Sequence, residues 1–129
     1  MSQEIVFGRI VPTLPVADMA RALAFYEREL GMTPVFTNGD PVMFAILTRD
    51  AAELHLHIAA AAARPGSPPG DVTNLNQAHL LVSDARALHD RLAAAGVPIL
   101  KALRDAPYGL RDFVFADPDG NRIDVGERL

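Results

Sequence analysis

The sequence predicts an α+β protein made of two βαβββ modules in tandem, because one pattern of residues occurs twice along the chain. Val16-Ala17-Asp18 opens a stretch of helical period, and Val82-Ser83-Asp84 opens a second one 66 positions later. Further on, residues 49–57 align without a gap on residues 116–124. A repeat of this length is one supersecondary unit used twice, and the paired units bury a face together. We therefore expect a ligand to lie in a cleft between two similar halves.

The first half is predicted to run strand, helix and three strands. Residues 5–16 are mostly β-branched and apolar, which predicts a strand, and Pro12 and Pro15 favour an edge position or a bulge. Asp18 is a suitable N-cap for the helix that follows, and Gly31 fits the position that ends it. Three strands are expected after the helix, at residues 33–37, 42–48 and 53–59, with turns at residues 38–41 and 50–52.

The second half repeats this order. A strand is predicted at residues 76–82, a helix at 84–95, and strands at 97–103, 113–116 and 121–125, with a tight turn over residues 117–120. Alanine, proline and glycine dominate residues 60–70, which is typical of a linker. The sequence thus predicts a single domain over residues 1–129, with module 1 at about 4–60, a linker at about 61–73 and module 2 at about 74–128.

Composition excludes several classes of function. The 129 residues are 50% apolar and 22% charged, with a net charge of −4 and no cluster of lysine and arginine, so neither nucleic acid nor a membrane is an expected partner. Cysteine is absent, which excludes disulfides and thiolate chemistry. No segment resembles a membrane span, a signal peptide or a nucleophile elbow, so we expect a cytoplasmic protein without nucleophilic catalysis.

Several segments, taken in order, resemble the vicinal oxygen chelate superfamily of glyoxalases, bleomycin resistance proteins and dioxygenases over residues 10–127. They are Pro12-Thr13-Leu14-Pro15-Val16-Ala17-Asp18, Ala24-Phe25-Tyr26-Glu27, Leu30-Gly31, Val82-Ser83-Asp84, Tyr108-Gly109-Leu110-Arg111-Asp112-Phe113 and Asp117-Pro118-Asp119-Gly120-Asn121. The Leu-Pro-Val and Tyr-Gly-Leu-Arg-Asp-Phe segments are most similar to the bleomycin-resistance branch. The resemblance implies a curved mixed sheet around a cleft, and a homodimer that binds a drug at the subunit interface without changing it.

The resemblance also implies where a metal ion would bind. The metal-dependent members carry ligands at four positions, which correspond here to Val11, His57, Gln77 and Asp124. Val11 has no donor atom and Gln77 is a weak neutral ligand, whereas a catalytic divalent ion generally takes three strong protein ligands. No metal cofactor is therefore expected; if one is present, His57, Asp124 and Gln77 would hold it. A shifted cluster of His55, His57, His79 and Asp124 is an alternative, although these residues equally suit the polar lining of a wet cleft.

Other residues are predicted to contact the ligand in this cleft. Tyr108 lies where the drug-binding members carry an aromatic residue, and a tyrosine can stack on a flat ring. Phe36 and Phe44 fall on the middle strands, and Arg111 could hold a carboxylate. The predicted cleft is therefore lined by His55, His57, Gln77, His79, Tyr108, Arg111, Asp124, Phe36 and Phe44. The bleomycin binders use an acidic aromatic groove, and this chain departs from them in having no tryptophan and two tyrosines.

These features predict a metal-independent protein that sequesters an antibiotic-type, bleomycin-like small molecule, planar or cationic, and so confers resistance. No catalytic residue is assigned under this hypothesis. A second hypothesis is a divalent-metal lyase, isomerase or dioxygenase that uses His57, Asp124 and one of Gln77 or His79. A third is a metabolite-binding protein with no role toward drugs, since a fold does not by itself specify a function.

Overall fold

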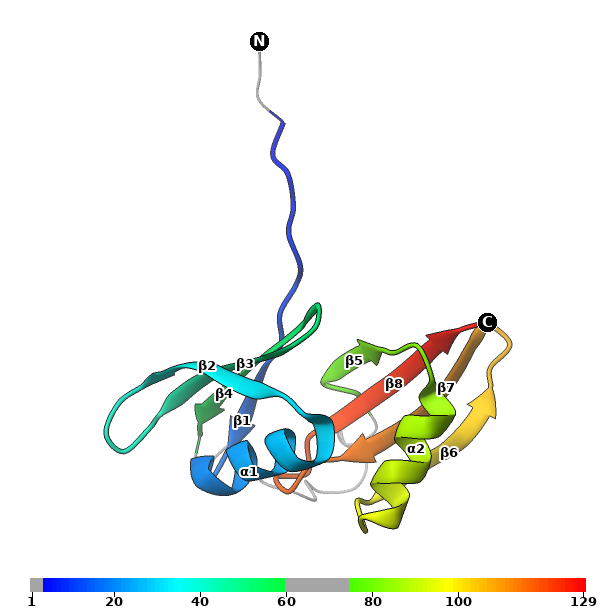
Figure 1. Cartoon of the computed structure of the whole chain (residues 1–129). Helices are drawn as coiled ribbons and strands as arrows, with labels where there is room; N and C mark the ends of the chain where they lie inside the picture. Colours follow the sequence, from blue (N-terminus) through cyan, green and yellow to red (C-terminus); the bar gives the residue numbers. More distant parts are fainter. Residues whose placement is uncertain (1–3, 60–74) are drawn as a thin grey trace.

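A computed structural model describes residues 4–59 and 75–129, and it confirms two βαβββ modules in tandem (Figure 1). Module 1 contains β1 (Thr13–Val16), α1 (Met19–Leu30), β2 (Thr33–Asn38), β3 (Phe44–Arg49) and β4 (Ala52–Ile58). Module 2 contains β5 (Ala78–Leu81), α2 (Ala85–Ala94), β6 (Ile99–Asp105), β7 (Leu110–Ala116) and β8 (Arg122–Arg128). The linker predicted at residues 61–73 lies outside the described residues.

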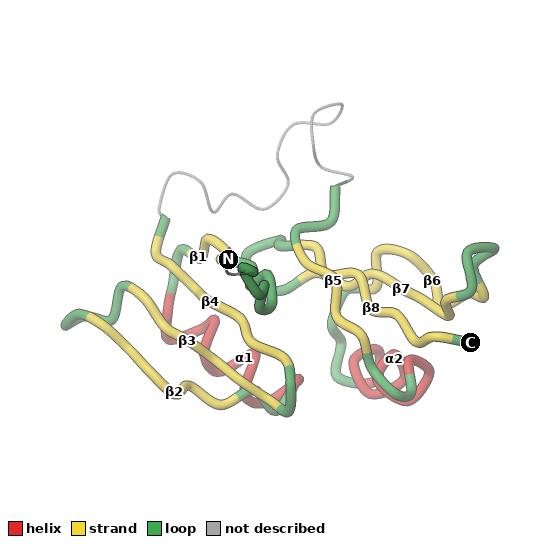
Figure 2. The backbone as a smooth tube through the Cα atoms, turned by 90° about the horizontal axis from the view of Figure 1, so that it is seen from above, coloured by secondary structure: helices red, strands yellow, loops and turns green. Residues whose placement is uncertain are grey.

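Each module forms its own four-stranded mixed sheet, and the two modules lie side by side (Figure 2). The strand orders are β1-β4-β3-β2 and β5-β8-β7-β6, with the first pair of each sheet parallel and the others antiparallel. The sequence repeat is therefore a structural repeat. Side chains alternate across each strand, so one face of each sheet packs against the helix of its own module and the other face does not.

Local chemistry explains both helices. The carboxylate of Asp18 accepts a hydrogen bond from the backbone N–H of Arg21 at 3.0 Å, and Asp84 does the same for Ala87. Gly31 ends α1 in the left-handed conformation, with φ of 64°, as predicted. None of the helices in residues 4–59 and 75–129 has the length and apolarity needed to cross a membrane.

The strand predicted at residues 5–16 is wrong for its first eight residues, 5–12, which together with Glu4 we call the N-terminal arm (residues 4–12). Strand β1 begins at Thr13, where it pairs in parallel with His55. Continuing this register toward the N-terminus would set residues 10–12 opposite residues 52–54, and the carbonyl of Pro12 does accept a 3.0 Å hydrogen bond from the backbone N–H of His55. Residues 4–9 would face residues before Ala52, where the chain has already turned away from β4. The arm instead extends from the body of the molecule (Figure 1), with Ile5, Val6, Phe7 and Ile10 between 84% and 99% exposed.

The turn at Asp117–Asn121 of module 2 docks on module 1 and joins the two halves. The buried carboxylate of Asp117 accepts hydrogen bonds from the backbone N–H groups of Asp119 (2.9 Å) and Asn121 (2.8 Å), which shapes the turn. Its other oxygen accepts a 2.7 Å bond from the hydroxyl of Tyr26 in α1. This single side chain therefore both folds the turn and binds it to the helix of the other module.

Two neighbours of Asp117 extend the same junction. Asp119 accepts hydrogen bonds from the backbone N–H of Ala17 (3.0 Å) and the guanidinium of Arg21 (2.9 Å), both in module 1. The side-chain amide of Asn121 donates to the carbonyl of Pro15 at 2.9 Å. Beside these polar contacts, the rings of Phe25 and Phe115 lie 6.3 Å apart across the junction, so the polar turn borders the shared apolar core.

Burial alters the titration of the two groups at the centre of this junction. Burial raises the pKa of Asp117, although its hydrogen bonds oppose that shift. Burial, followed by the nearby charge of Asp117, raises the pKa of Tyr26 well above its ordinary value. Tyr26 therefore keeps its proton and acts as a permanent donor to Asp117.

Replacing Tyr26 with phenylalanine should destabilise the protein without changing its shape. The variant Tyr26→Phe removes one of the two side-chain donors to Oδ2 of the buried Asp117 and leaves the amide of Asn121, at 2.9 Å. Losing this hydrogen bond to a charged group costs about 1.5–3 kcal/mol of unfolding free energy. Urea denaturation of both proteins measures this difference. The matched control is Tyr108→Phe, because Tyr108 is 60% exposed and its carboxylate partner keeps an arginine at 3.5 Å, so a smaller loss of about 0.5 kcal/mol or less is expected. Equal losses in the two variants would contradict the role of Tyr26.

Candidate functional site

Four of the predicted cleft residues lie together on the face of the first sheet that α1 does not cover. Strand register places Phe44 opposite His57, and Ile46 opposite both His55 and Phe36. Leu47, Leu54 and Leu56 point to the other face and are buried in the core against α1. Phe36, Phe44, His55 and His57 therefore share one helix-free surface, as period-two alternation requires.

Three of these side chains form a chain of aromatic contacts. The ring centroids of Phe36 and Phe44 are 6.3 Å apart, and those of Phe44 and His55 are 5.3 Å apart, both in edge-to-face geometry. The Nε2 atom of His55 lies 2.7 Å from a carboxylate oxygen of Glu53, which fixes the ring. Phe36 is 51% exposed, so this cluster presents an apolar aromatic surface beside a negative charge.

The second sheet contributes a hydrogen-bonded histidine and aspartate to its own helix-free face. His79 in β5 lies in register with Asp124 in β8, and its Nδ1 atom is 2.7 Å from the carboxylate. Gly126 leaves room for the ring, since a Cβ atom at that position would lie 3.0 Å from Cε1 of His79. The glycine is therefore part of the site, because a side chain there would displace the imidazole.

Tyr108 and Arg111 occupy different faces of the second sheet. The hydroxyl of Tyr108 donates to Asp112, and this hydrogen bond is the largest cause of the raised pKa of Tyr108. Asp112 lies opposite Gly126 and shares the face of His79 and Asp124. Arg111 and Phe113 are two residues apart in β7, so both point to the face that α2 covers. The guanidinium of Arg111 pairs with the carboxylate of Asp105 at 2.8 Å. The structure thus separates Arg111 from the other predicted cleft residues.

Gln77, just before β5, has a structural role. Its amide nitrogen donates to the side-chain oxygen of Asn121 at 3.0 Å, and its amide oxygen accepts from the backbone N–H of Arg122 at 2.6 Å. Asn121 in turn donates to Pro15 of module 1. Both polar atoms of Gln77 are therefore used to hold the Asp117–Asn121 turn.

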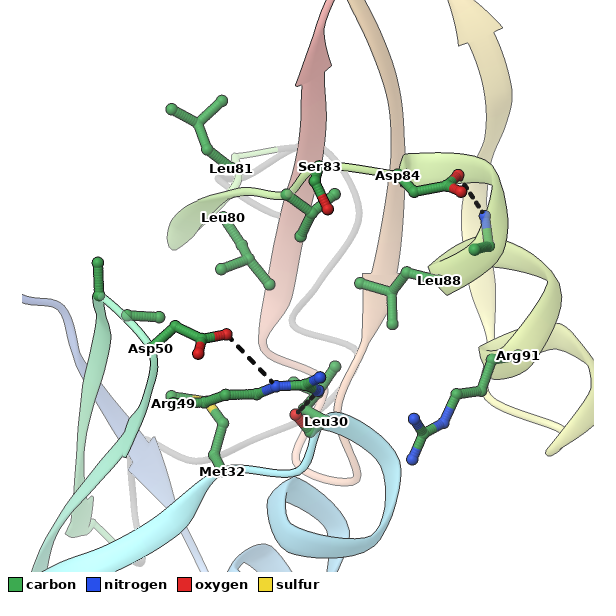
Figure 3. A pocket seen from close by; sticks show the side chains of 14 residues that line it. Leu30, Met32, Arg49, Asp50, Leu80, Leu81, Ser83, Asp84, Leu88 and Arg91 are labelled. Atoms are coloured by element: carbon green, nitrogen blue, oxygen red, sulfur yellow. Dashed lines mark hydrogen bonds and ion pairs between the residues drawn. The ribbon is translucent and has the colours of Figure 1, made fainter.

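A groove runs between the two modules, where the sequence predicted a cleft, but of the nine predicted cleft residues only His79 lines it. It has two lobes of about 490 and 440 Å³. Figure 3 shows the larger lobe, where Arg49 and Asp50 of module 1 face Leu80, Leu88 and Arg91 of module 2. Both lobes share the side chains that form the apolar floor and the wall at the start of β4: Leu30, Met32, Ala51, Ala52, Leu80 and Leu81.

The repeat explains why this groove is open. The turn at Asp50–Ala52 is the module 1 equivalent of the Asp117–Asn121 turn, but it lacks the groups that close the junction on the other side. Ala52 replaces Asp119, Leu54 replaces Asn121, and Leu92 of α2 replaces Tyr26. The carboxylate of Asp50 consequently stays 92% exposed. Comparing the two halves residue by residue would have revealed this difference in the sequence.

The family of the chain follows from comparison with known proteins. The model of the Glyoxalase/Bleomycin resistance protein/Dioxygenase superfamily matches residues 7–125. The chain belongs to this superfamily. No relative is found among the curated proteins.

Solved structures of the superfamily share this fold. An antibiotic-binding protein, TnmS3 from Streptomyces sp. CB03234, is 25% identical with a TM-score of 0.72, over 98% of this chain and 100% of that one. A superfamily member from Sphaerobacter thermophilus DSM 20745 is 25% identical with a TM-score of 0.73, over 95% and 98% of the two chains. A bleomycin-binding protein in complex with bleomycin is 21% identical with a TM-score of 0.74, over 95% and 100%.

The metal site that the superfamily implies does not fit the donor atoms present. Of the four corresponding positions, Val11 offers no donor and Gln77 has both amide atoms engaged within the protein. Asp124 is paired with His79. Within residues 4–59 and 75–129, no three side chains among histidine, cysteine, aspartate and glutamate come together as a set of ligands. His57 and Asp124 remain the only strong donors of the four positions.

Variants of Gln77 test whether its side chain stabilises the Asp117–Asn121 turn. Gln77→Leu removes both hydrogen bonds to the Asp117–Asn121 turn, so the unfolding free energy should fall by about 1–2 kcal/mol in urea denaturation. Gln77→Glu keeps an oxygen acceptor for Arg122 and should recover part of this loss. If Gln77→Leu unfolds like the unaltered protein, the hydrogen bonds of this amide do not hold the turn.

Proposed function

We propose that the chain is a homodimeric protein that binds and sequesters an antibiotic-type small molecule without a metal ion. The observation that carries this proposal is the chemistry of the superfamily's ligand positions, where Val11 cannot coordinate and Gln77 is committed to the Asp117–Asn121 turn. An aromatic surface made of Phe36, Phe44 and His55 lies on the same sheet as His57. A binding surface of this kind needs shape and aromatic faces rather than a Lewis acid.

The chemistry of this surface favours a planar and cationic ligand. Phe36 and Phe44 provide ring faces on which a flat heteroaromatic group can stack. Glu53 and Asp124 place carboxylates on the two helix-free faces, and the chain carries a net charge of −4. Both carboxylates already have a basic partner within the chain, so the net negative charge is what opposes an anionic ligand.

Similar structures support the same class of ligand. TnmS3 is an antibiotic-binding protein, and the bleomycin-binding protein was solved with bleomycin bound. At 21–25% identity these proteins support a ligand class and not a particular drug. The proposed dimer would close the helix-free faces, which the single chain leaves open on two sheets. A cytoplasmic location and a role in resistance stay predictions from the sequence.

Ligand binding can be tested by thermal shift with bleomycin and other planar cationic antibiotics, with and without EDTA. A molecule that binds the native state raises the melting temperature, and the shift grows with the logarithm of its concentration once the site is saturated. We expect a shift with at least one of these compounds, and we expect EDTA to leave it unchanged.

Two variants then locate the site. Phe44→Ala removes the central ring of the aromatic cluster and should weaken binding roughly tenfold. Arg111→Ala is the matched control, because Arg111 lies on the face covered by α2, and its affinity should stay within about twofold of the unaltered protein. Isothermal titration measures the affinity of each variant and shows whether the loss is confined to Phe44→Ala.

The enzyme hypothesis predicts the opposite set of results. It requires a stoichiometric divalent metal in the purified protein, and its loss when His57→Ala or Asp124→Ala is introduced. Elemental analysis measures both. A metal that is lost in both variants, together with a ligand response abolished by EDTA, would overturn the proposal of metal-independent binding.

A further inference from the structure

The larger lobe of the groove brings together two arginines from different modules. The guanidinium of Arg49, in β3, donates to the carbonyl of Leu30 at 2.8 Å. The guanidinium of Arg91, in α2, donates to the carbonyl of Arg28 at 3.0 Å. Both carbonyls belong to the last turn of α1, at the negative end of the helix dipole. Figure 3 shows the two guanidinium groups pointing toward each other from opposite sides of the lobe, so the end of α1 fixes two cations beside one cavity.

These bonds use only part of the donor capacity of the two arginines. A guanidinium group carries five N–H donors, and each arginine gives one nitrogen to a carbonyl of α1. The side chain of Arg49 is 51% exposed and Arg91 is also exposed, so other donors of both groups reach the solvent. Gly31 makes room for Arg49, because a Cβ atom there would lie 3.0 Å from its Nη1 atom. Both cations are thus in place before a ligand arrives, which lowers the entropic cost of binding.

Two carboxylates also line the larger lobe, but neither lies between the two arginines (Figure 3). Asp84 is the N-cap of α2 and accepts the backbone N–H of Ala87 at 3.0 Å. Asp50 is 92% exposed, and its carboxylate lies 3.8 Å from Nε of Arg49. An ion pair this long and this exposed contributes about 0–1 kcal/mol, so the acid group of a ligand can displace Asp50 at little cost.

Apolar side chains from both modules line the rest of the lobe. They are Leu30, Met32, Leu80, Leu81 and Leu88, which we call the apolar wall. Figure 3 shows Leu80 and Leu88 above the two arginines, and Leu81 is 47% exposed. The lobe holds about 490 Å³, within the range of roughly 300–1,000 Å³ that is typical of small-molecule sites. It therefore combines a cationic end with an apolar wall in a space of ligand size.

We infer that the larger lobe binds a small amphipathic carboxylate, with its acid group between Arg49 and Arg91 and its hydrocarbon part on the apolar wall. The planar fork of a guanidinium matches the two oxygens of a carboxylate. Each CH₂ group that leaves water for the wall adds about 0.8 kcal/mol. An amine would meet two like charges, and a small inorganic anion would leave the apolar wall in water.

The overall charge of the chain does not prevent an acid from binding here. The net charge of −4 acts at long range and is screened beyond about 8 Å at physiological ionic strength, whereas the guanidinium groups act at contact. One arginine comes from each module, so the bound acid joins the modules on the side that the repeat leaves open. None of Phe36, Phe44 and His55 lines this lobe, so the inference goes beyond the proposed function and does not rest on it.

The first test compares three probes of equal chain length by isothermal titration. Octanoate should bind at one molecule per chain. Octylamine and octanol should bind at least tenfold more weakly, because the amine is repelled by both arginines and the alcohol carries no charge. Absence of saturable octanoate binding, or octylamine that binds as tightly as octanoate, would overturn the inference.

The second test removes each cation in turn. Arg49→Gln and Arg91→Gln should each weaken octanoate binding at least tenfold, because each loses a charge-assisted hydrogen bond to the acid. The matched control is Arg86→Gln, since Arg86 is also an exposed arginine of α2 but does not line the lobe. Its affinity should stay within about twofold of the unaltered protein. Normal octanoate binding by both Arg49→Gln and Arg91→Gln would refute the site.

The third test predicts a gain, which a misfolded variant cannot imitate. Asp50→Asn removes the carboxylate that competes for Arg49, so octanoate should bind at least twofold more tightly. If Asp50→Asn instead weakens octanoate and strengthens octylamine, the lobe selects cations and the inference is wrong.

These tests are separable from the test of antibiotic binding. Arg49→Gln should leave any thermal shift with bleomycin unchanged, because Arg49 lies outside the aromatic surface. If planar antibiotics fail to bind while octanoate depends on both arginines, only the proposed function fails. If an antibiotic binds and octanoate does not, only the present inference fails.

Discussion

A single buried carboxylate determines how the two modules are joined. Asp117 shapes its turn through backbone N–H groups and accepts the hydroxyl of Tyr26 from the opposite module. Because an unpartnered buried carboxylate is costly, the turn and α1 must fold against each other to satisfy it. Asp119 and Asn121 then attach β1 and the start of α1 to the same turn. The orientation of both sheets, and hence of every candidate ligand contact, depends on this junction.

The groove and the altered metal positions both arise where the two modules differ. The Asp117–Asn121 junction is closed, whereas its counterpart at Asp50–Ala52 is open, because Leu92 stands where α1 has Tyr26. The closed junction gives a rigid unit, and the open one gives a groove along the edge of β5. The same comparison applies to the metal positions, since Gln77 belongs to the closed junction and is thereby removed from coordination. Loss of symmetry within the repeat thus accounts for both the groove and the altered donor set.

Local signals made most of the fold predictable from the sequence. Asp18, Asp84 and Gly31 set the helix ends, and the caps occur as expected because they depend on neighbours within a turn of the chain. Strand ends depend on pairing between distant segments, so the arm was wrongly assigned to a strand and β7 begins at Leu110 rather than at residue 113.

The candidate site was predictable where alternation alone decides the face of a strand. It placed His55 and His57 together, and it would also have placed Arg111 with Phe113 had the period been followed one step further. The partners of Gln77 and the lining of the groove between the modules needed the tertiary structure. Because the polar contacts between the two modules gather at the Asp117–Asn121 turn, this turn is placed to act as a hinge between them. A small pivot about that turn would widen or narrow the opposite side and loosen little besides the exposed bond from Arg91 to the carbonyl of Arg28. Adaptability to molecules of different thickness would then come from rigid-body motion of the modules, with adjustment of the shared core where Phe25 meets Phe115.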